Sequence, residues 1–303
     1  MPAERALVTG ASGFIGRHLC RRLIAKNFKV HGVSSHEQKD KHDGIFWHRA
    51  DLTASSEIEK VMNSVRPDLI IHLAGEVTGN RRLEHVVPTL QNNLVSTVYL
   101  MTKAAELGCK RFILTGSLEE PDPGAPAVPA SPYAAAKWSA SGYARMFWDL
   151  YRLPVSIARL FMVYGPAQRD TSKLVPYVIL SLLRGEAPKL SSGKRPVDWI
   201  YVDDVVDGLV LMADAPGIEG QTVELGSGNL VTIREVVEEI TRLIDSSAKP
   251  LFGALPERPM EQVRVADVEG SYRKIAWKPK TPLISGLQQT IDWYSSQKPE
   301  KQE

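Results

Sequence analysis

The sequence predicts an α/β fold in which helices cover both faces of a doubly wound parallel β-sheet, followed by a smaller C-terminal region. Two observations support this prediction. Through the first 165 residues, short apolar runs alternate with amphipathic stretches of helical spacing, a pattern typical of a parallel sheet wrapped by helices. A glycine-rich turn also lies between the first apolar run and the first amphipathic stretch, at a place where open α/β sheets bind ligands.

The individual elements follow from this alternation. Helices are expected where apolar residues recur at helical spacing, and the third of them ends at Gly108, a natural stop. After Gly165 and Pro166, prolines and glycines interrupt the regular alternation. We expect strands at 5–9, 29–33, 45–49, 68–74, 111–114 and 155–160, and helices at 15–26, 56–63, 89–107 and 132–150.

Composition narrows the range of functions. The chain has 303 residues, of which 43% are hydrophobic and 24% are charged, so it can bury a large core. Its 37 basic and 35 acidic residues are mixed along the chain, which argues against a nucleic-acid partner. Cys20 and Cys109 form neither a disulfide framework nor a metal-ligand motif, so we expect a reducing compartment and no metal. Without a basic leader or an apolar window of about 18 residues, the chain is expected to be cytoplasmic and to have no membrane partner.

The glycine-rich turn carries the first chemical signal. Glycines let the backbone bend sharply and approach a pyrophosphate, and the following helix offers free N–H groups and a positive dipole. Placed at the start of an alternating pattern, the turn indicates a Rossmann-type dinucleotide-binding domain over residues 1–165, with 166–303 forming mainly a substrate-binding region. The expected cofactor contacts in this turn are Gly10, Ser12, Gly13, Phe14, Ile15 and Gly16.

The residues after the second predicted strand bear on the choice between NADP and NAD. An acidic side chain there would hydrogen-bond the adenosine ribose of NAD, whereas this chain has Ser34 and Ser35. Because a carboxylate is absent, a 2′-phosphate would not be repelled, and three side chains besides Ser35 could approach one: Arg17, His36 and Lys39. We therefore expect NADP. NAD is the alternative, because Glu37 or Asp40 could serve the ribose.

Further cofactor contacts are expected after the next two strands. Asp51 and Leu52 follow the third strand, where the carboxylate could reach the adenine. The fourth strand ends near His72, for which we favour an interior histidine with satisfied hydrogen bonds. The residues that could line the nicotinamide side there are Leu73, Ala74 and Gly75.

Tyr133 and Lys137, one helical turn apart, carry the second chemical signal. A neighbouring ammonium favours the phenolate and can lower the pKa of the tyrosine toward the range useful for proton transfer. The spacing alone is weak evidence, because Tyr99 and Lys103 repeat it in mid-helix. Tyr133, in contrast, begins a helix, and Ser117 ends the preceding strand at the edge of the sheet where ligands bind. We predict that Ser117, Tyr133 and Lys137 are catalytic, with turn capping as the alternative role of Ser117.

These residues resemble the extended short-chain dehydrogenases, the family of NAD-dependent epimerases and dehydratases that act on nucleotide sugars. The resemblance runs over nearly the whole chain and includes the glycine turn, the catalytic residues and the segment RLFMVYGP at 159–166. The segment DWIYVDD at 198–204 is similar to the family's strand that returns to the sheet, so a returning segment is expected near 198–226. Arg258 and Asp267 resemble parts of its C-terminal substrate region.

The resemblance implies a role for each matching residue. Tyr133 is the implied acid/base, Lys137 holds the nicotinamide ribose and Ser117 orients the sugar. Arg258 is expected to meet the diphosphate of a nucleotide-sugar substrate. A homodimer is also implied, with an interface formed by the two helices that contain Thr97 and Ala140.

The chain departs from the family pattern at the expected diphosphate grip. Met162 stands where the family usually carries an asparagine, and Val197 stands where an arginine is expected. Arg195 lies slightly upstream. We therefore expect substrate contacts at Met162, Arg195 and Arg258 in a grip that differs from the family's usual one.

A second departure bears on the reaction. Where dehydratases of the family have a threonine and an acidic pair, this chain has Ser117, Leu118 and Glu119. Glu119 is a candidate substrate contact and could act as a base, but the neighbouring acid is missing, so a 4,6-dehydratase is disfavoured.

The remaining choice lies between a reductase and an epimerase. Because a reductase consumes NADPH and the ribose carboxylate is absent, the first hypothesis is reduction of a nucleotide-linked 4-keto-6-deoxy-sugar, with hydride from the nicotinamide and a proton from Tyr133. The alternative is a nucleotide-sugar 4-epimerase with retained NAD. A non-catalytic dinucleotide sensor is a third hypothesis, which the presence of both Tyr133 and Lys137 disfavours.

Overall fold

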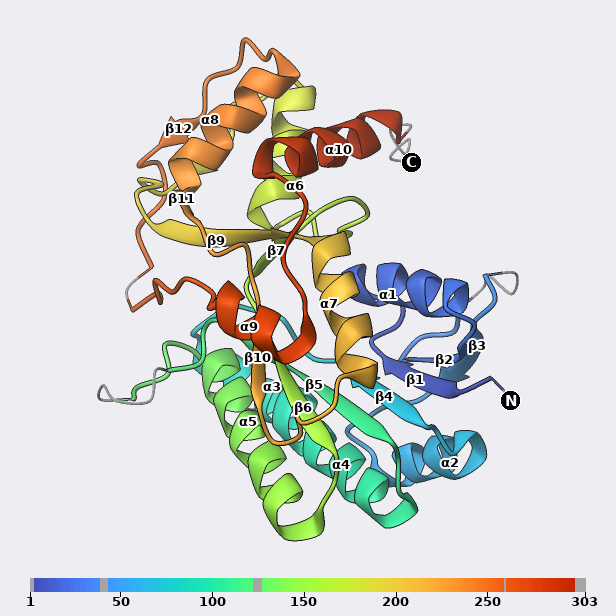
Figure 1. Cartoon of the computed structure of the whole chain (residues 1–303). Coiled ribbons are helices and arrows are strands. Elements are labelled where there is room, and N and C mark those ends of the chain that lie inside the picture. The colour runs from blue at the N-terminus through green and yellow to red at the C-terminus, as the bar shows by residue number, and fades with distance from the viewer. Residues whose placement is uncertain (1–2, 39–42, 122–126, 259, 298–303) are drawn as a thin grey trace.

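The computed structural model describes residues 3–38, 43–121, 127–258 and 260–297, and its centre is a seven-stranded sheet (Figure 1). The strand order is β10-β6-β5-β4-β1-β2-β3, and all neighbouring pairs are parallel. From β1, the chain adds β2 and β3 on one side and β4, β5 and β6 on the other. The crossovers therefore change direction between β1 and β4, and this change opens a crevice at the carboxyl ends of these two strands. The predicted doubly wound α/β fold is confirmed. The strands are β1 (Arg5–Thr9), β2 (Lys29–Ser34), β3 (Phe46–Arg49), β4 (Leu69–His72), β5 (Arg111–Ser117), β6 (Val155–Leu160) and β10 (Thr222–Leu225).

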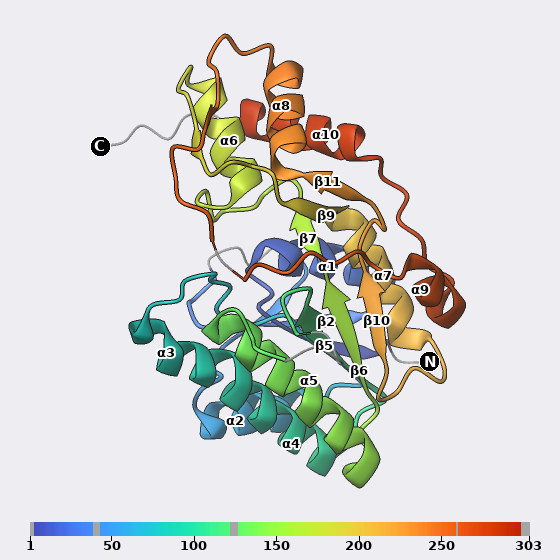
Figure 2. The same cartoon turned by 90° about the vertical axis from the view of Figure 1, so that its left-hand side faces the viewer.

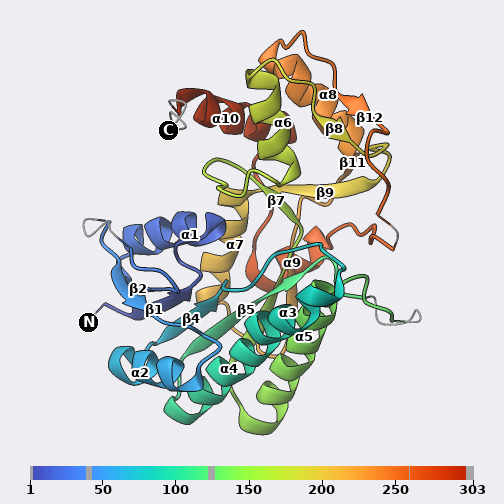
Figure 3. The same ribbon diagram turned by 180° about the vertical axis from the view of Figure 1, so that it is seen from behind.

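Helices cover both faces of the sheet (Figure 3). Successive strand residues point to opposite faces, so Leu7 and Ile70 enter one core cluster while Val8 and Ile71 enter another. The core cluster that contains Val8 also contains residues of α1 and α7. The core cluster that contains Leu7 also contains residues of α2, α4 and α5. These helices are α1 (Phe14–Ala25), α2 (Ser55–Val65), α4 (Ser96–Leu107), α5 (Pro132–Tyr151) and α7 (Val202–Asp214).

Some element boundaries differ from the prediction for local reasons. β5 continues to Ser117, because Gly116 and Ser117 pair with Arg159 and Leu160 of β6. The helix expected over 89–107 is divided into three parts. These are α3 (Val86–Leu90), a π-helical turn (Gln91–Val95) and α4, preceded by a 3₁₀ turn (Leu83–His85).

The C-terminal half forms a smaller lobe above the carboxyl edge of the sheet (Figure 2). In this lobe, β9 (Pro196–Tyr201) pairs with β7 (Met162–Tyr164) and β11 (Leu230–Thr232) in a separate sheet. The prediction that the strand beginning at Asp198 returns to the central sheet is therefore wrong, and β10 is the strand that returns. Packing explains the difference, because Trp199 and Tyr201 are buried in a third core cluster with the helices of the lobe.

The remaining elements complete this lobe and its connection to the sheet. α9 packs against β10 and α7, so the chain revisits the central sheet before its last helix. Within the described ranges, no helix has the length and apolar content needed to cross a membrane. The remaining elements are α6 (Leu174–Leu183), β8 (Lys189–Leu190), α8 (Ile233–Ile244), β12 (Leu251–Phe252), α9 (Val268–Ile275) and α10 (Leu283–Ser296).

Two buried histidines predict that the fold loses stability below neutral pH. Burial lowers the pKa of His72 to about 3, and burial, with a smaller contribution from His48, lowers the pKa of His31 to about 4. In the unfolded chain both groups have a pKa near 6.5, so the folded state binds fewer protons below that value. Their contribution to stability is therefore complete above about pH 6.5 and is lost as the pH falls, down to about 4 for His31 and about 3 for His72. At pH 5.0, His31 alone is expected to remove about 2 kcal/mol from the free energy of unfolding.

Urea unfolding of wild type and His31→Phe at pH 7.5 and 5.0 tests this expectation. The phenyl ring retains the stacking against Phe46 but cannot take up a proton. We expect the variant to lose less stability than wild type between the two pH values, by about 2 kcal/mol. An equal loss in both proteins would show that His31 does not cause the pH dependence.

Candidate active site

The glycine turn between β1 and α1 is shaped for a closely approaching ligand. Gly10 has a φ of 66°, a conformation that favours glycine, and its carbonyl accepts the N–H of Gly13 at 2.9 Å. α1 begins at Phe14, and its N-cap, Gly13, provides no side-chain cap. The first N–H groups of a helix have no intrahelical partner, so the end formed by Phe14, Ile15 and Gly16 suits the pyrophosphate of a dinucleotide.

Ser34 ends β2 directly beside this turn. Its hydroxyl accepts a hydrogen bond from Ser12 Oγ at 3.2 Å. Arg17 reaches the same area, where its Nε donates to the carbonyl of Ser12 at 3.1 Å. Ser35 is exposed next to them. The end of β2, where a protein carboxylate would bind the adenosine ribose of NAD, therefore holds hydroxyl groups and a guanidinium group. Two further candidates lie outside the described residues: Lys39 and Asp40.

Asp51 and Leu52 follow β3 at the same edge of the sheet. One oxygen of Asp51 accepts the backbone N–H and the hydroxyl of Thr53 at 2.9 and 2.8 Å. These bonds hold the pKa of the exposed Asp51 carboxyl below its ordinary value. The carboxylate is thus charged and fixed by a local turn, with its second oxygen free of these bonds.

The residues after β4 pack directly against the glycine turn. Any side chain on Gly10 would meet the backbone of Leu73 and Ala74, so the two loops lie in close contact. Gly75 follows with a φ of 159°. The side chain of His72 bonds Thr9 Oγ1 at 2.7 Å and Thr97 Oγ1 at 2.8 Å. The prediction of an interior histidine with satisfied hydrogen bonds is confirmed.

The structure brings the three predicted catalytic residues together at the carboxyl end of β5. Ser117 is the last residue of this strand, and Tyr133 lies in the first turn of α5, which Ser131 caps with its hydroxyl. The Tyr133 and Ser117 side chains are hydrogen-bonded. Lys137 Nζ donates to the Thr115 carbonyl at 2.8 Å and lies 6.0 Å from the centroid of the Tyr133 ring. Ser117 Oγ also accepts the N–H of Glu119 at 3.2 Å, so the serine caps a turn as well.

The second tyrosine–lysine pair forms no comparable site. Tyr99 is on the outer side of α4 with 39% of its surface exposed. Lys103 is ion-paired with Glu59 at 3.2 Å and with Glu106 at 3.0 Å. Position relative to the sheet edge therefore separates the two pairs.

Burial dominates the electrostatics of the catalytic group. It lowers the pKa of Lys137 to about 8, against the opposing charge of Glu120. Burial also raises the pKa of Tyr133; the bond to Ser117 opposes this change, whereas the carboxylates of Glu119 and Glu120 add to it. This differs from the expectation that the ammonium lowers the tyrosine pKa, because in the protein alone desolvation of the phenolate is the larger effect.

A charged pocket adjoins the catalytic group and contains three predicted substrate contacts. Its lining includes Glu119, Arg195 and Arg258, together with Arg81 and Glu261. Nε of Arg195 lies 2.8 Å from the Glu261 carboxylate. Burial raises the pKa of Glu119, and the charge of Glu261 adds to the effect. The pocket thus offers guanidinium groups that suit phosphates and carboxylates that suit hydroxyl donors.

The fourth predicted substrate contact, Met162, lies outside this lining. It is on β7 and packs against the core clusters of the sheet and of the C-terminal lobe. Val197, where the family places an arginine, is buried in the core of that lobe. Arg195 is therefore the guanidinium that this part of the chain brings into the pocket.

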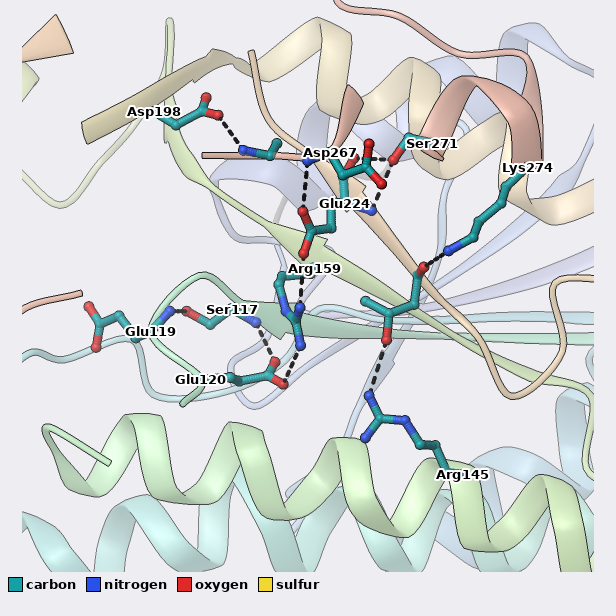
Figure 4. Close-up of polar contacts among 12 residues, drawn as sticks. Ser117, Glu119, Glu120, Arg145, Arg159, Asp198, Glu224, Asp267, Ser271 and Lys274 are labelled. Atoms are coloured by element: carbon teal, nitrogen blue, oxygen red, sulfur yellow. Dashed lines mark hydrogen bonds and ion pairs between the residues drawn. The ribbon is translucent and has the colours of Figure 1, made fainter. Parts of the chain in front are cut away.

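Sequence reasoning missed Glu120, Arg81 and Glu261. Glu120 is fully buried, and its Oε1 accepts the backbone N–H of Ser117 at 2.7 Å (Figure 4). Gly116 is the sequence feature that could have indicated it, because a glycine inside a strand often marks the close approach of another group. Here a side chain at position 116 would overlap the Glu120 carboxylate. Arg81 and Glu261 come from loops far apart in sequence, so no local pattern marks them. Within the described ranges, no group of three or more histidine, cysteine, aspartate or glutamate side chains could hold a metal ion.

Comparison with known proteins defines the class of enzyme. The NAD dependent epimerase/dehydratase family matches residues 6–226. The chain is 30% identical over 318 residues to the UDP-glucose 4-epimerase of Mycolicibacterium smegmatis, covering 96% of this chain and 98% of that one. It is 29% identical over 340 residues to the dTDP-glucose 4,6-dehydratase of Neisseria gonorrhoeae, covering 99% and 98%. Its fold matches that of the Thermus thermophilus UDP-glucose 4-epimerase in complex with NAD, with a TM-score of 0.85, 24% identity and coverage of 96% and 99%.

The protein belongs to the NAD dependent epimerase/dehydratase family, and the resemblance inferred from its motifs is confirmed. It is therefore an enzyme of the nucleotide-sugar epimerase and dehydratase class. The 30% identity to a UDP-glucose 4-epimerase favours epimerisation, the alternative hypothesis, over reduction, the first hypothesis. The relatives give no specific support to NADP.

Proposed function

We propose that this protein is a nucleotide-sugar 4-epimerase that uses retained NAD as a transient hydride carrier. The observation that carries the proposal is the convergence of Ser117, Tyr133 and Lys137 at the sheet edge that also holds the glycine turn, beside the charged pocket. The identity to a UDP-glucose 4-epimerase supports the choice of reaction. Leu118, where dehydratases carry an acid, disfavours elimination.

Each catalytic side chain has a separate task in this reaction. The Tyr133 side chain, as its phenolate, takes the proton from the C4 hydroxyl of the sugar and, as the resulting phenol, returns it after inversion, while Ser117 orients that oxygen. Lys137 Nζ lies 2.8 Å from the Thr115 carbonyl and 3.5 Å from the Thr115 hydroxyl, and its ammonium would donate a further N–H to the nicotinamide ribose. When bound, NAD would supply the hydride acceptor and a positive charge beside the phenol. The uncapped start of α1 fits its pyrophosphate.

The charged pocket is the proposed site for the nucleotide diphosphate and the sugar. Arg81, Arg195 and Arg258 bring guanidinium groups that can pair with phosphate oxygens. The backbone N–H of Glu119 donates to the Ser117 hydroxyl, and its side chain can accept a hydrogen bond from a sugar hydroxyl. In this proposal, residues 1–165 form the dinucleotide-binding domain, and residues 166–303 mainly form the substrate-binding region.

Conversion without added cofactor tests the epimerase. Purified protein is incubated with UDP-glucose and with other nucleotide hexoses, and the sugar products are separated by chromatography. We expect the C4 epimer to form without net NADH, and denatured protein to release about one NAD per active site. If no nucleotide hexose is inverted and NADPH is consumed with a 4-keto sugar nucleotide, the epimerase proposal is wrong.

A 4-keto-6-deoxy-sugar reductase that uses NADPH is the second candidate, favoured by Ser34 and Arg17 beside the glycine turn. If these residues receive a 2′-phosphate, Ser34→Asp is expected to weaken NADPH binding at least tenfold, or about 1.4 kcal/mol, because the new carboxylate repels the phosphate. Calorimetric titrations of NADH and NADPH check this, with Ser295→Asp, at an exposed position on α10 in the C-terminal lobe, as the control. A wild-type protein that binds NADH at least tenfold tighter than NADPH would exclude the reductase.

We also propose that the protein is a homodimer that pairs through α4 and α5. These helices carry large apolar side chains that are partly exposed, a feature typical of interaction surfaces. Thr97 and Ala140 themselves are buried within the subunit, so their exposed neighbours would make the contact. These neighbours are Tyr99, Trp138, Tyr143 and Leu150.

A further inference from the structure

A chain of charged side chains runs from the catalytic strand to the C-terminal segment (Figure 4). It starts at Glu120, whose Oε1 accepts the N–H of Ser117 at 2.7 Å. The second oxygen of Glu120 lies 3.4 Å from Nη2 of Arg159. Nη1 of Arg159 lies 2.9 Å from Oε1 of Glu224. The other oxygen of Glu224 accepts the backbone N–H of Asp267 at 2.9 Å.

The far end of this chain is fastened to β10 of the central sheet and to β9 of the small sheet. The Ser271 hydroxyl donates to the Glu224 carbonyl at 2.7 Å, and Asp198 accepts the N–H of Ala266 at 3.0 Å. We define residues 260–267 as the strap. The strap carries Glu261, which lines the charged pocket and pairs with Arg195. The charged chain therefore links the catalytic serine to a segment that lines the proposed substrate site.

The alignment of three neighbouring strands makes this chain possible. Gly116 of β5, Arg159 of β6 and Glu224 of β10 are in register across the sheet. Gly116 has no side chain, and the Glu120 carboxylate occupies the space that one would fill. Burial of Glu120 and Arg159 is costly unless each charge is paired, and here one guanidinium lies between two carboxylates. The arrangement fixes the loop after β5 relative to β10 and the strap.

We infer that Glu120 is a positioning residue that aligns Ser117 with the strap, so that a substrate held in the pocket meets the catalytic hydroxyls at a fixed distance. This inference rests on the proposed nucleotide-sugar site and concerns how that site is aligned. The negative charge of Glu120 also faces Tyr133 and Lys137. Among the described residues, the other titratable groups that face them are Glu119 from the same loop, His72 at the end of β4, which faces Lys137, and Arg264 from the strap, which faces Glu120.

Glu120→Gln is the direct test, because it keeps the size of the side chain and an acceptor for the Ser117 N–H. Arg159 retains Glu224, so its buried guanidinium keeps a partner. We expect amide hydrogen exchange in residues 260–271 to become at least five times faster, and KM for the nucleotide sugar to rise about tenfold. The acidic limb of the kcat/KM profile is expected to shift by about one pH unit to lower pH, because a negative charge beside Tyr133 is lost.

Two further variants separate positioning from a general structural effect. Glu224→Gln is expected to speed exchange in the strap and to raise KM, but to leave the pH profile unchanged, because Glu224 lies beyond Arg159 from Tyr133. Glu219→Gln is the matched control. Glu219 pairs with Arg111 at 2.8 Å, and Arg111 is the first residue of β5, at the strand end away from the site. The control is expected to leave exchange of 260–271, KM and the pH profile as in wild type.

Failure of the inference about Glu120 can be distinguished from failure of the proposed function. If wild type converts no nucleotide sugar, that function fails, and the exchange measurement still tests the link between Glu120 and the strap. Exchange in residues 260–271 that is as slow in Glu120→Gln as in Glu219→Gln would overturn the inference. So would an unchanged KM with an unchanged pH profile in an active Glu120→Gln enzyme.

Discussion

Tyr133→Phe is expected to lower kcat by about 100- to 10,000-fold while binding of NAD stays within about twofold of wild type. The phenol is the proposed acid/base beside Ser117 at the carboxyl end of β5, and the substitution removes the hydroxyl that would exchange the proton. The change should preserve the fold, because Phe fills the same space in the first turn of α5 and Lys137 keeps its bond to Thr115. Steady-state kinetics and calorimetry with NAD measure the two quantities.

The chain provides its own control for this experiment. Tyr99 precedes Lys103 by the same spacing, yet it is exposed on α4 and is not among the residues that line the charged pocket. Tyr99→Phe is expected to leave kcat within about twofold of wild type. If Tyr133→Phe retains more than a tenth of wild-type activity, the assignment of the acid/base is wrong. An equal loss in both variants would point to an effect of the helices on assembly rather than on proton transfer.

The central sheet was predictable because its signals are local. Each buried strand is an apolar run, and each connection carries amphipathic spacing or a glycine. The small sheet of the C-terminal lobe gave no comparable signal. β7 has only three residues, and β9 joins it because Trp199 and Tyr201 pack with helices from other parts of the chain. Such a pairing depends on tertiary packing, so the motif around Asp198 does not by itself indicate which sheet its strand joins.

The candidate site shows the same division between local and distant signals. The sequence predicts Ser117, Tyr133 and Lys137 as one group, because their positions relative to strand and helix ends place them at one edge. It does not predict that Glu120 is buried, since a glutamate in a proline-rich loop is usually solvated. Its partner Arg159 is 39 positions away in sequence, and Glu224 is 65 positions beyond that. Only folding brings these charges into one row.

Gly16→Ala is expected to abolish most cofactor binding and to destabilise the fold. An added methyl group would overlap the carbonyl of Gly10 and the backbone of Ala11, and these atoms belong to the turn itself, so they cannot move aside cheaply. Crowding of this kind costs about 1–3 kcal/mol in unfolding free energy. Opening the turn also displaces the N–H groups proposed to bind the pyrophosphate, so NAD binding should weaken at least 100-fold, or about 2.8 kcal/mol.

Gly142→Ala separates this steric effect from the general consequence of replacing a helical glycine. Gly142 lies in α5, is exposed and, among the described residues, has no atoms close to the position of an added methyl group. Alanine there should raise the free energy of unfolding by about 0.5–1 kcal/mol, because it restricts the unfolded chain and favours the helix. Urea unfolding and calorimetry of both variants give opposite signs for stability if the argument holds. If Gly16→Ala bound NAD as tightly as wild type does, the glycine turn would not be the pyrophosphate site, and the cofactor would have to lie elsewhere along the carboxyl edge of the sheet.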